Sequence, residues 1–173
     1  IPFIGGNGIL QSVFSAIEIA IWDVRGKILE VPTSQLINNN SRKIIPLYAS
    51  SGTVVFTPNE IIRDVENILD LGYTAYKMRV GYQDWNTDIK RVENARNAFG
   101  KNDLMVDAIM GTLRPAWSAD KAISRAKTLV DFNLRWLEEP VHPENIKGLA
   151  EVCQSKLVPI AAGEAYSGNG EYQ

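Results

Sequence analysis

The chain has 173 residues, of which 45% are hydrophobic and 22% are charged, and its formal net charge is -2. This composition is typical of a globular protein with one sizeable core and argues against intrinsic disorder. Lysine and arginine are scattered singly among acids, which excludes a basic nucleic-acid surface, and no apolar run reaches the roughly 20 residues of a membrane span. We therefore expect a soluble, cytoplasmic protein that binds neither nucleic acid nor membrane.

The first predicted element is an amphipathic helix over residues 11–26. Its apolar face is formed by Val13, Ile17, Ala20 and Ile21. Gly26 is expected to end the helix, and the polar segment 36–43 is expected to be a loop.

After this loop, short apolar runs alternate with longer amphipathic ones. The runs that predict strands begin at Ile45, Ala75, Leu104, Leu134 and Pro159. A helix is predicted in every interval: after Thr57, over residues 85–99, after Ser118 and after Glu144. The clearest start is Thr57-Pro58-Asn59-Glu60, which combines a capping box with proline at the first helical position.

This serial βα repetition predicts an α/β fold with a parallel sheet covered by helices. A doubly wound sheet and a (β/α)8 barrel, the TIM barrel, both fit the pattern. No G-x-G-x-x-G sequence follows an early strand, as a dinucleotide-binding fold would require, so we favour a partial (β/α)8-type barrel of about five βα units.

Ionisable residues stand near the carboxyl ends of the later predicted strands. They are Lys77 and Arg79, then Asp107, then Glu138 and Glu139, then Glu164. Charges in a strand that is buried on both faces are costly unless they reach the rim or find partners. Barrel enzymes place their chemistry at this rim, so these residues are the candidate site.

Regular spacing predicts that four of these residues lie at nearly the same height on successive strands. Intervals of 30, 31 and 26 residues separate Lys77, Asp107, Glu138 and Glu164. Three neighbouring carboxylates repel unless a cation joins them, and oxygen ligands without histidine or cysteine suit Mg²⁺. The alternative is that the acids are ordinary strand-end charges, neutralised by Lys77 and Arg79.

Adjacent residues of a strand point to opposite faces, so Glu138 and Glu139 cannot both reach the rim. We expect Glu138 to face the mouth of the barrel and Glu139 to face the helical layer in an ion pair. Pro140 then ends the strand pairing.

Five sequence motifs in this order resemble the enolase superfamily, specifically its mandelate racemase-like branch. They are "SAIEIAIWDVRGK", "YKMRVG", "LMVDAIMG", "WLEEP" and "PIAAGE". The resemblance implies that Asp107, Glu138 and Glu164 bind Mg²⁺, with Glu139 outside the coordination shell. It also implies removal of a proton α to a carboxylate with stabilisation of the enediolate, as in acid-sugar dehydratases and racemases that act on small hydroxy acids.

The chain departs from the family pattern at the second strand. The usual motif is K-x-K, in which the second lysine is the base, and here that position is Arg79. A guanidinium stays protonated, so it is a poor base and a good clamp for an oxyanion. If a proton is removed from this face, Lys77 has to remove it, with a pKa lowered by Arg79 and the metal. Ile109 stands where the family often has asparagine.

The resemblance also implies parts that lie outside this sequence. We expect a fragment of a longer protein, with residues 1–42 as the linking helix and remnant of an N-terminal capping domain, and residues 43–173 as the partial barrel. Five strands leave two exposed edges, which another chain or segment has to cover, and we expect a homo-oligomer.

Two other functions remain open. Lys77 could form a Schiff base with a carbonyl substrate, although this leaves the acids unexplained. Alternatively, the chain could be a non-catalytic, eroded family member, as Arg79 and Ile109 suggest. His142 is expected in a surface loop and Cys153 in the core.

Overall fold

The computed structural model describes residues 8–166, which form two compact units. One unit contains residues 8–46 and Tyr166, and the other is Leu47–Ala165. Within residues 8–166, no helix combines the length and the apolarity that crossing a membrane needs.

The first unit contains helix α1 (Ile9–Leu29), which the sequence predicts, and the short helix α2 (Thr33–Ile37), which it does not. The prediction that Gly26 ends the first helix is wrong. Gly26 is buried inside α1, and a Cβ atom there would lie 2.9 Å from the carbonyl oxygen of Val31. The glycine therefore allows the chain to pass close to the helix, which ends at Glu30 in the left-handed conformation.

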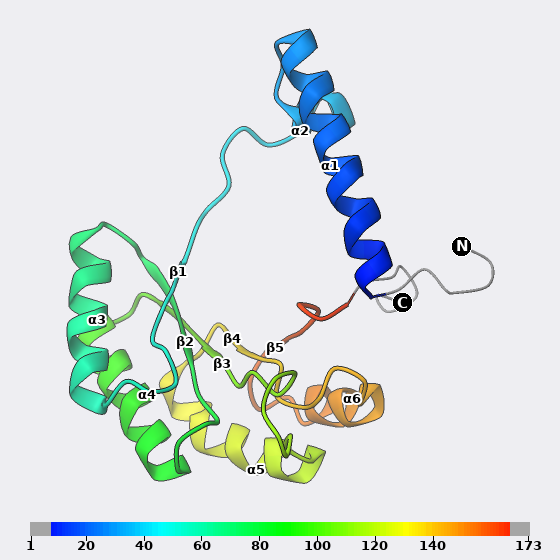
Figure 1. Ribbon diagram of the computed structural model, residues 1–173. Coiled ribbons are helices and arrows are strands. Elements are labelled where there is room, and N and C mark those ends of the chain that lie inside the picture. Colours follow the sequence, from blue (N-terminus) through cyan, green and yellow to red (C-terminus); the bar gives the residue numbers. More distant parts are fainter. Residues whose placement is uncertain (1–7, 167–173) are drawn as a thin grey trace. The chain divides into compact units, whose positions relative to one another are not determined.

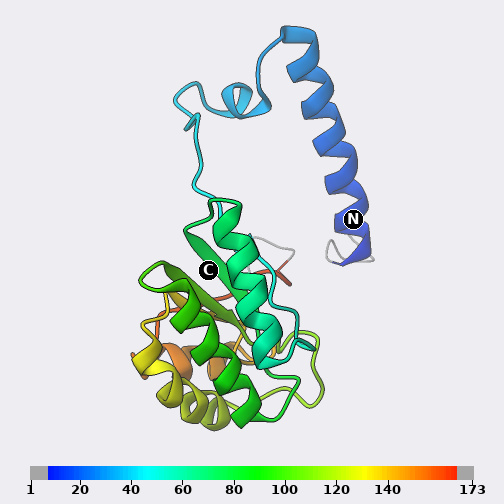
Figure 2. The same cartoon turned by 90° about the vertical axis from the view of Figure 1, so that its left-hand side faces the viewer.

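The second unit is a five-stranded, fully parallel sheet with the strand order β1-β2-β3-β4-β5. Its elements are β1 (Ala49–Ser50), α3 (Pro58–Asp70), β2 (Ala75–Arg79), α4 (Trp85–Phe99), β3 (Asp103–Asp107), α5 (Ala119–Leu129), the 3-10 helix η1 (Val130–Phe132), β4 (Trp136–Glu138), α6 (Ile146–Gln154) and β5 (Ile160–Ala161). Figures 1 and 2 show helices α3 to α6 arranged along one side of the sheet. Within residues 8–166, the five strands and the four helices between them match the partial barrel that the sequence predicts.

Polar side chains cap the amino-terminal ends of the helices. Thr57 and Glu60 form the predicted capping box of α3, with proline at the start of the helix. Asp84 accepts hydrogen bonds from two backbone N–H groups at the start of α4, and Ser118 caps α5. Each such cap contributes about 1 kcal/mol.

The core lies between the helices and one face of the sheet. Tyr76 and Met78 of β2 point into it and are fully buried, as are Val106 of β3 and Leu137 of β4. Because strand residues alternate, Lys77 and Arg79 lie on the opposite face of β2. The sheet thus separates an apolar layer from a face that carries ionisable groups.

The register of the sheet places one residue from each of strands β2 to β5 in a common row. The row consists of Arg79, Asp107, Glu138 and Ala161. All five strands are shorter than the apolar runs that predicted them. Strand β1 contains only Ala49 and Ser50, so the predicted start at Ile45 is wrong. Beyond the row, Ile109 and Glu139 adopt left-handed backbone conformations, which end the extended structure of β3 and β4.

Candidate metal centre

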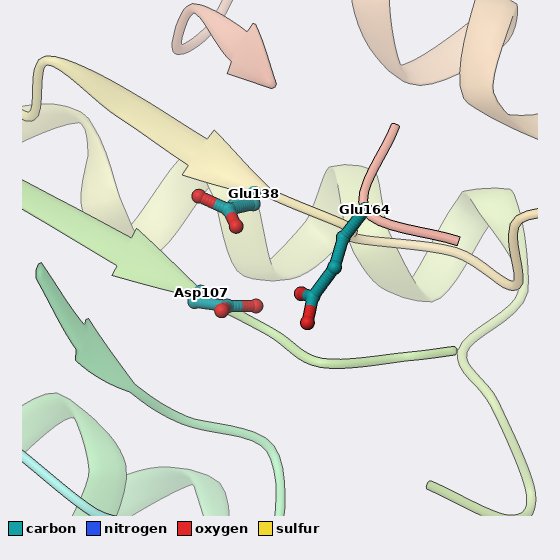
Figure 3. A group of neighbouring side chains, drawn as sticks. All are labelled: Asp107, Glu138 and Glu164. Atoms are coloured by element: carbon teal, nitrogen blue, oxygen red, sulfur yellow. The ribbon is translucent and has the colours of Figure 1, made fainter. Parts of the chain in front are cut away.

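Three carboxylates converge beyond the carboxyl ends of strands β3, β4 and β5. Asp107 is the last residue of β3, Glu138 is the last residue of β4, and Glu164 follows β5 in a turn. Figure 3 shows the three side chains pointing toward one another. One carboxylate oxygen of each residue lies within 4.8 Å of those of the other two, which is close enough for one ion to touch all three.

Asp107 is the buried member of the group, with 1% of its surface exposed. Burial raises the pKa of its carboxyl group, and the charge of Glu138 raises it further. The backbone N–H of Ile109 donates a hydrogen bond of 2.9 Å to Asp107 Oδ1, and this bond and Lys77 oppose the rise only in part. The left-handed conformation of Ile109 is part of the turn that brings this N–H back to the carboxylate.

Lys77 contacts two of the acids from β2. Its Nζ atom lies 2.6 Å from Glu138 Oε1 and 3.3 Å from Asp107 Oδ2. Burial lowers the pKa of Lys77, but the hydrogen bond to Glu138 and the charges of both acids outweigh this effect, so the pKa lies above its ordinary value. The lowering of this pKa that we expect from Arg79 and a metal concerns the protein with its ion bound, and it stays a prediction.

The predicted common height of the four residues is also wrong in detail. Lys77 pairs with Met105, two residues before Asp107, and Glu164 lies three residues beyond Ala161 of the common row. The four groups nevertheless meet. The long side chain of Lys77 reaches the acids at the carboxyl ends of β3 and β4, and the turn after β5 brings Glu164 to Asp107 and Glu138. Equal sequence intervals therefore predicted the grouping but not the register.

The donor set fits a hard divalent cation. It consists of three carboxylates, without histidine or cysteine, and such ligands suit Mg²⁺. Asp107 Oδ2 is buried and has no hydrogen-bond partner among the described residues, so it offers free lone pairs. Lys77 Nζ forms an ion pair with this oxygen at 3.3 Å.

Arg79 stands beside Asp107 in the common row and is only partly buried. Its guanidinium makes no hydrogen bond or ion pair with any residue between 8 and 166, although its backbone carbonyl accepts one from Arg91. A guanidinium without a partner at a strand end is suited to binding an anionic ligand, and carboxylates match its planar geometry.

Two cavities adjoin the acids, and Arg79 and Glu164 line both. One, of about 380 Å³, is further lined by residues at the ends of β3 and β4, including Ile109, Thr112 and Glu139. The other, of about 450 Å³, lies over the sheet face and is lined by Tyr48, Ser50, Lys77 and Glu138, among others. Both are large enough for a small organic acid.

Between residues 8 and 166, Glu139 does not form the predicted ion pair. It is 4% exposed, and its Oε1 atom accepts a hydrogen bond of 2.8 Å from the backbone N–H of Gly163. With a φ of 46°, Glu139 has left the extended conformation, so the argument from alternating strand faces does not hold at this residue. It supports the loop that carries Glu164 and lines the smaller cavity.

Sequence reasoning missed two aromatic residues of the site. The indole N–H of Trp136 donates a hydrogen bond of 2.9 Å to Glu138 Oε2, and the Tyr48 ring packs edge-on against Trp136. Trp136 precedes Glu138 by two residues, so the strand period would have placed both on one face. For Tyr48, which comes before the first paired residue of β1, the sequence contains no comparable pattern.

The two remaining predictions concern residues outside the site. His142 lies in a loop, as expected, and its Nε2 atom is 2.9 Å from an Arg114 nitrogen. The core position predicted for Cys153 is wrong, because its side chain is exposed. It faces away from the buried side of α6, on which Val152 packs.

Comparisons with known proteins show the family. Residues 60–173 match the family model described as enolase C-terminal domain-like, so the chain belongs to that family, as its motifs suggested. It is 32% identical over 163 residues to a 3,6-anhydro-alpha-L-galactonate cycloisomerase of Streptomyces coelicolor, covering 94% of this chain and 44% of the relative. It is 30% identical over 172 residues to the L-talarate/galactarate dehydratase of Salmonella typhimurium, covering 98% and 42%.

Solved structures show the same fold and contain the expected ion. A racemase from Streptomyces coelicolor A3(2) with bound magnesium has a TM-score of 0.86 and 32% identity, over 95% of this chain and 45% of that one. The chain thus spans less than half the length of the relatives it matches.

Proposed function

We propose that this chain carries a Mg²⁺ centre at which a proton α to a carboxylate is removed from a small acid sugar or hydroxy acid, leading to dehydration or racemisation. The observation that supports this most directly is the convergence of the Asp107, Glu138 and Glu164 carboxylates within 4.8 Å, beside Lys77. Relatives named as dehydratases, cycloisomerases and racemases support the class of reaction.

In this proposal Asp107, Glu138 and Glu164 hold the ion. A bound Mg²⁺ would supply positive charge that stabilises the charge developing on the substrate and neutralises the acids that raise the pKa of Lys77. Asp107 contributes the most rigid ligand, because β3 and the Ile109 N–H fix its carboxylate.

Lys77 and Arg79 have separate roles. The Nζ atom of Lys77 lies at the acids and takes the α-proton, whereas Arg79 holds a substrate carboxylate, since its guanidinium is free of partners between residues 8 and 166. A guanidinium is not deprotonated in proteins, so Arg79 does not act as the base.

The test is exchange of the α-hydrogen in deuterated water, followed by NMR over a panel of acid sugars and hydroxy acids. We expect Mg²⁺-dependent exchange that is lost in Lys77→Met and in Asp107→Asn. Asp131→Asn is the matched control, because Asp131 is an exposed aspartate beyond α5. Absence of exchange with every substrate would contradict the proposal, and metal binding without exchange would identify a non-catalytic family member.

The Schiff-base alternative receives no support from the geometry. It leaves the three converged carboxylates without a role, because a lysine nucleophile needs no cluster of acids beside it. Borohydride trapping with carbonyl substrates should leave the mass of the protein unchanged.

A further inference from the structure

The two carboxylate oxygens of Glu138 have different hydrogen-bond partners. Oε1 accepts from Lys77 Nζ at 2.6 Å, and Oε2 accepts from the indole Nε1 of Trp136 at 2.9 Å. The ammonium group of Lys77 is positively charged, so a metal ion bound to the same carboxylate would repel it. Trp136 is neutral and can only donate, so its hydrogen bond is compatible with a cation on the same carboxylate.

The Trp136 ring is itself held in place. Tyr48 packs against it edge-to-face, with ring centroids 5.7 Å apart and an angle of 81° between the planes. Lys77 Nζ lies 5.8 Å from the centre of the Tyr48 ring, so Tyr48 contacts both partners of Glu138. The guanidinium of the exposed Arg135 side chain lies 5.9 Å from the centre of the Trp136 ring.

We propose that Trp136 is a positioning residue for the metal centre. Its indole N–H fixes the rotation of the Glu138 carboxylate, so that one oxygen is directed toward Asp107 and Glu164 before an ion arrives. Groups that orient metal ligands in this way commonly change metal affinity 10- to 100-fold when they are removed. This inference rests on the metal centre proposed above and extends it to a residue that does not touch the ion.

The first experiment measures metal affinity by isothermal titration calorimetry with Mn²⁺ and Mg²⁺ on the full chain. Trp136→Phe keeps a ring against Tyr48 but removes the N–H, and we expect affinity about tenfold weaker. Trp85→Phe is the matched control, because the Trp85 indole donates to Thr128 Oγ1 at 3.1 Å, away from the acids. Its affinity should equal that of the wild type. Equal affinity in Trp136→Phe would overturn the proposal.

A second measurement does not depend on a folded Trp136 variant. The chain has four tryptophans, so a ¹⁵N spectrum should contain four indole N–H signals. We expect the Trp136 signal, identified by sequential assignment in the wild type, to move strongly in Glu138→Gln and not in Glu151→Gln. Glu151 is an exposed residue of α6. An unmoved signal would overturn the proposed link between Trp136 and Glu138.

The outcomes separate this inference from the proposed reaction. A wild-type protein that binds no divalent ion would overturn the metal centre and the role of Trp136 together. A protein that binds Mg²⁺ but exchanges no α-hydrogen would overturn the reaction alone, and the comparison of Trp136→Phe with Trp85→Phe would still decide the role of Trp136.

Discussion

Strand β2 separates two groups of polar side chains that differ in how completely their partners satisfy them. The outer group, on the helical side, consists of Asp64, Tyr76, Asp88 and Arg91. The inner group, on the other face, consists of Lys77, Asp107, Glu138 and Glu164. Tyr76 and Lys77 are neighbours in sequence and belong to different groups because strand residues alternate.

The outer group is nearly saturated with hydrogen bonds. Arg91 is fully buried, and its two terminal nitrogens donate to Asp88 and to the carbonyls of Gly52, Thr53 and Arg79, which leaves only Nε without a partner. Asp88 accepts from Arg91 and from the Gly81 N–H. These bonds tie the ends of β1 and β2 to α4.

The inner group leaves binding capacity free. Asp107 Oδ2 has no hydrogen-bond partner within the described chain, and Arg79 beside it has no side-chain partner there. A buried polar group without a partner is costly, and one that persists in a folded protein points to a ligand. The comparison thus teaches that saturation, rather than burial, distinguishes a structural charge from a functional one.

The largest expected effect is on stability in the outer group. Arg91→Leu leaves Asp88 buried without its cation and should lower the free energy of unfolding by about 3–5 kcal/mol. Urea denaturation measures this. The matched control is Arg135→Leu, which removes an exposed ion pair with Asp103 and should cost less than about 1 kcal/mol. Similar losses in both variants would contradict the distinction between buried and exposed pairs.

The next effect is on metal binding in the inner group. Asp107→Asn should weaken Mg²⁺ affinity more than about 100-fold, because the buried carboxylate is a ligand and not merely a support. The free energy of unfolding should change by about 1 kcal/mol or less, since Lys77 keeps its pair with Glu138 and an amide oxygen can still accept from Ile109. Calorimetry and urea denaturation measure the two quantities. A large loss of stability with unchanged affinity would place Asp107 among the structural charges.

A smaller effect is expected at Arg79. Arg79→Met should raise KM for the acid substrate about tenfold, the cost of losing one charge-assisted hydrogen bond. Metal affinity and stability should stay close to the wild type, because the guanidinium has no partner in residues 8–166. Steady-state kinetics measure KM, and an unchanged KM would remove Arg79 from the substrate site.

The smallest effect is a pH dependence of the outer group. Burial and the hydrogen bond to Asp64 raise the pKa of Tyr76 above its ordinary value of 10. The unfolded chain therefore loses this proton first, and the stability contributed by Tyr76 is complete below pH 10 and falls as the pH rises above it. Between pH 10 and 11, the free energy of unfolding should fall more steeply in the wild type than in Tyr76→Phe, by at most about 1.4 kcal/mol per pH unit. Parallel curves from urea denaturation would contradict this.

Periodicity and capping residues predicted the order of strands and helices, because these depend on local sequence. Thr57 with Glu60 fixed one helix start, and the three acids were found because each stands at or just beyond the carboxyl end of its own strand. The surroundings of Lys77 were not predictable, since they depend on side-chain length and on the height of each strand end. The contact of Glu139 with Gly163 depends on a left-handed backbone, which a glutamate gives no reason to expect.

The common row of the parallel sheet has a consequence for how such a protein diversifies. Each βα unit delivers its own chemical group to the shared rim, and the helices that separate the groups lie on the far side of the sheet. A replacement at position 79 therefore changes one functional group while the neighbouring groups keep their positions. The same scaffold can thus acquire new chemistry one strand at a time, while the apolar core that stabilises the fold stays unchanged.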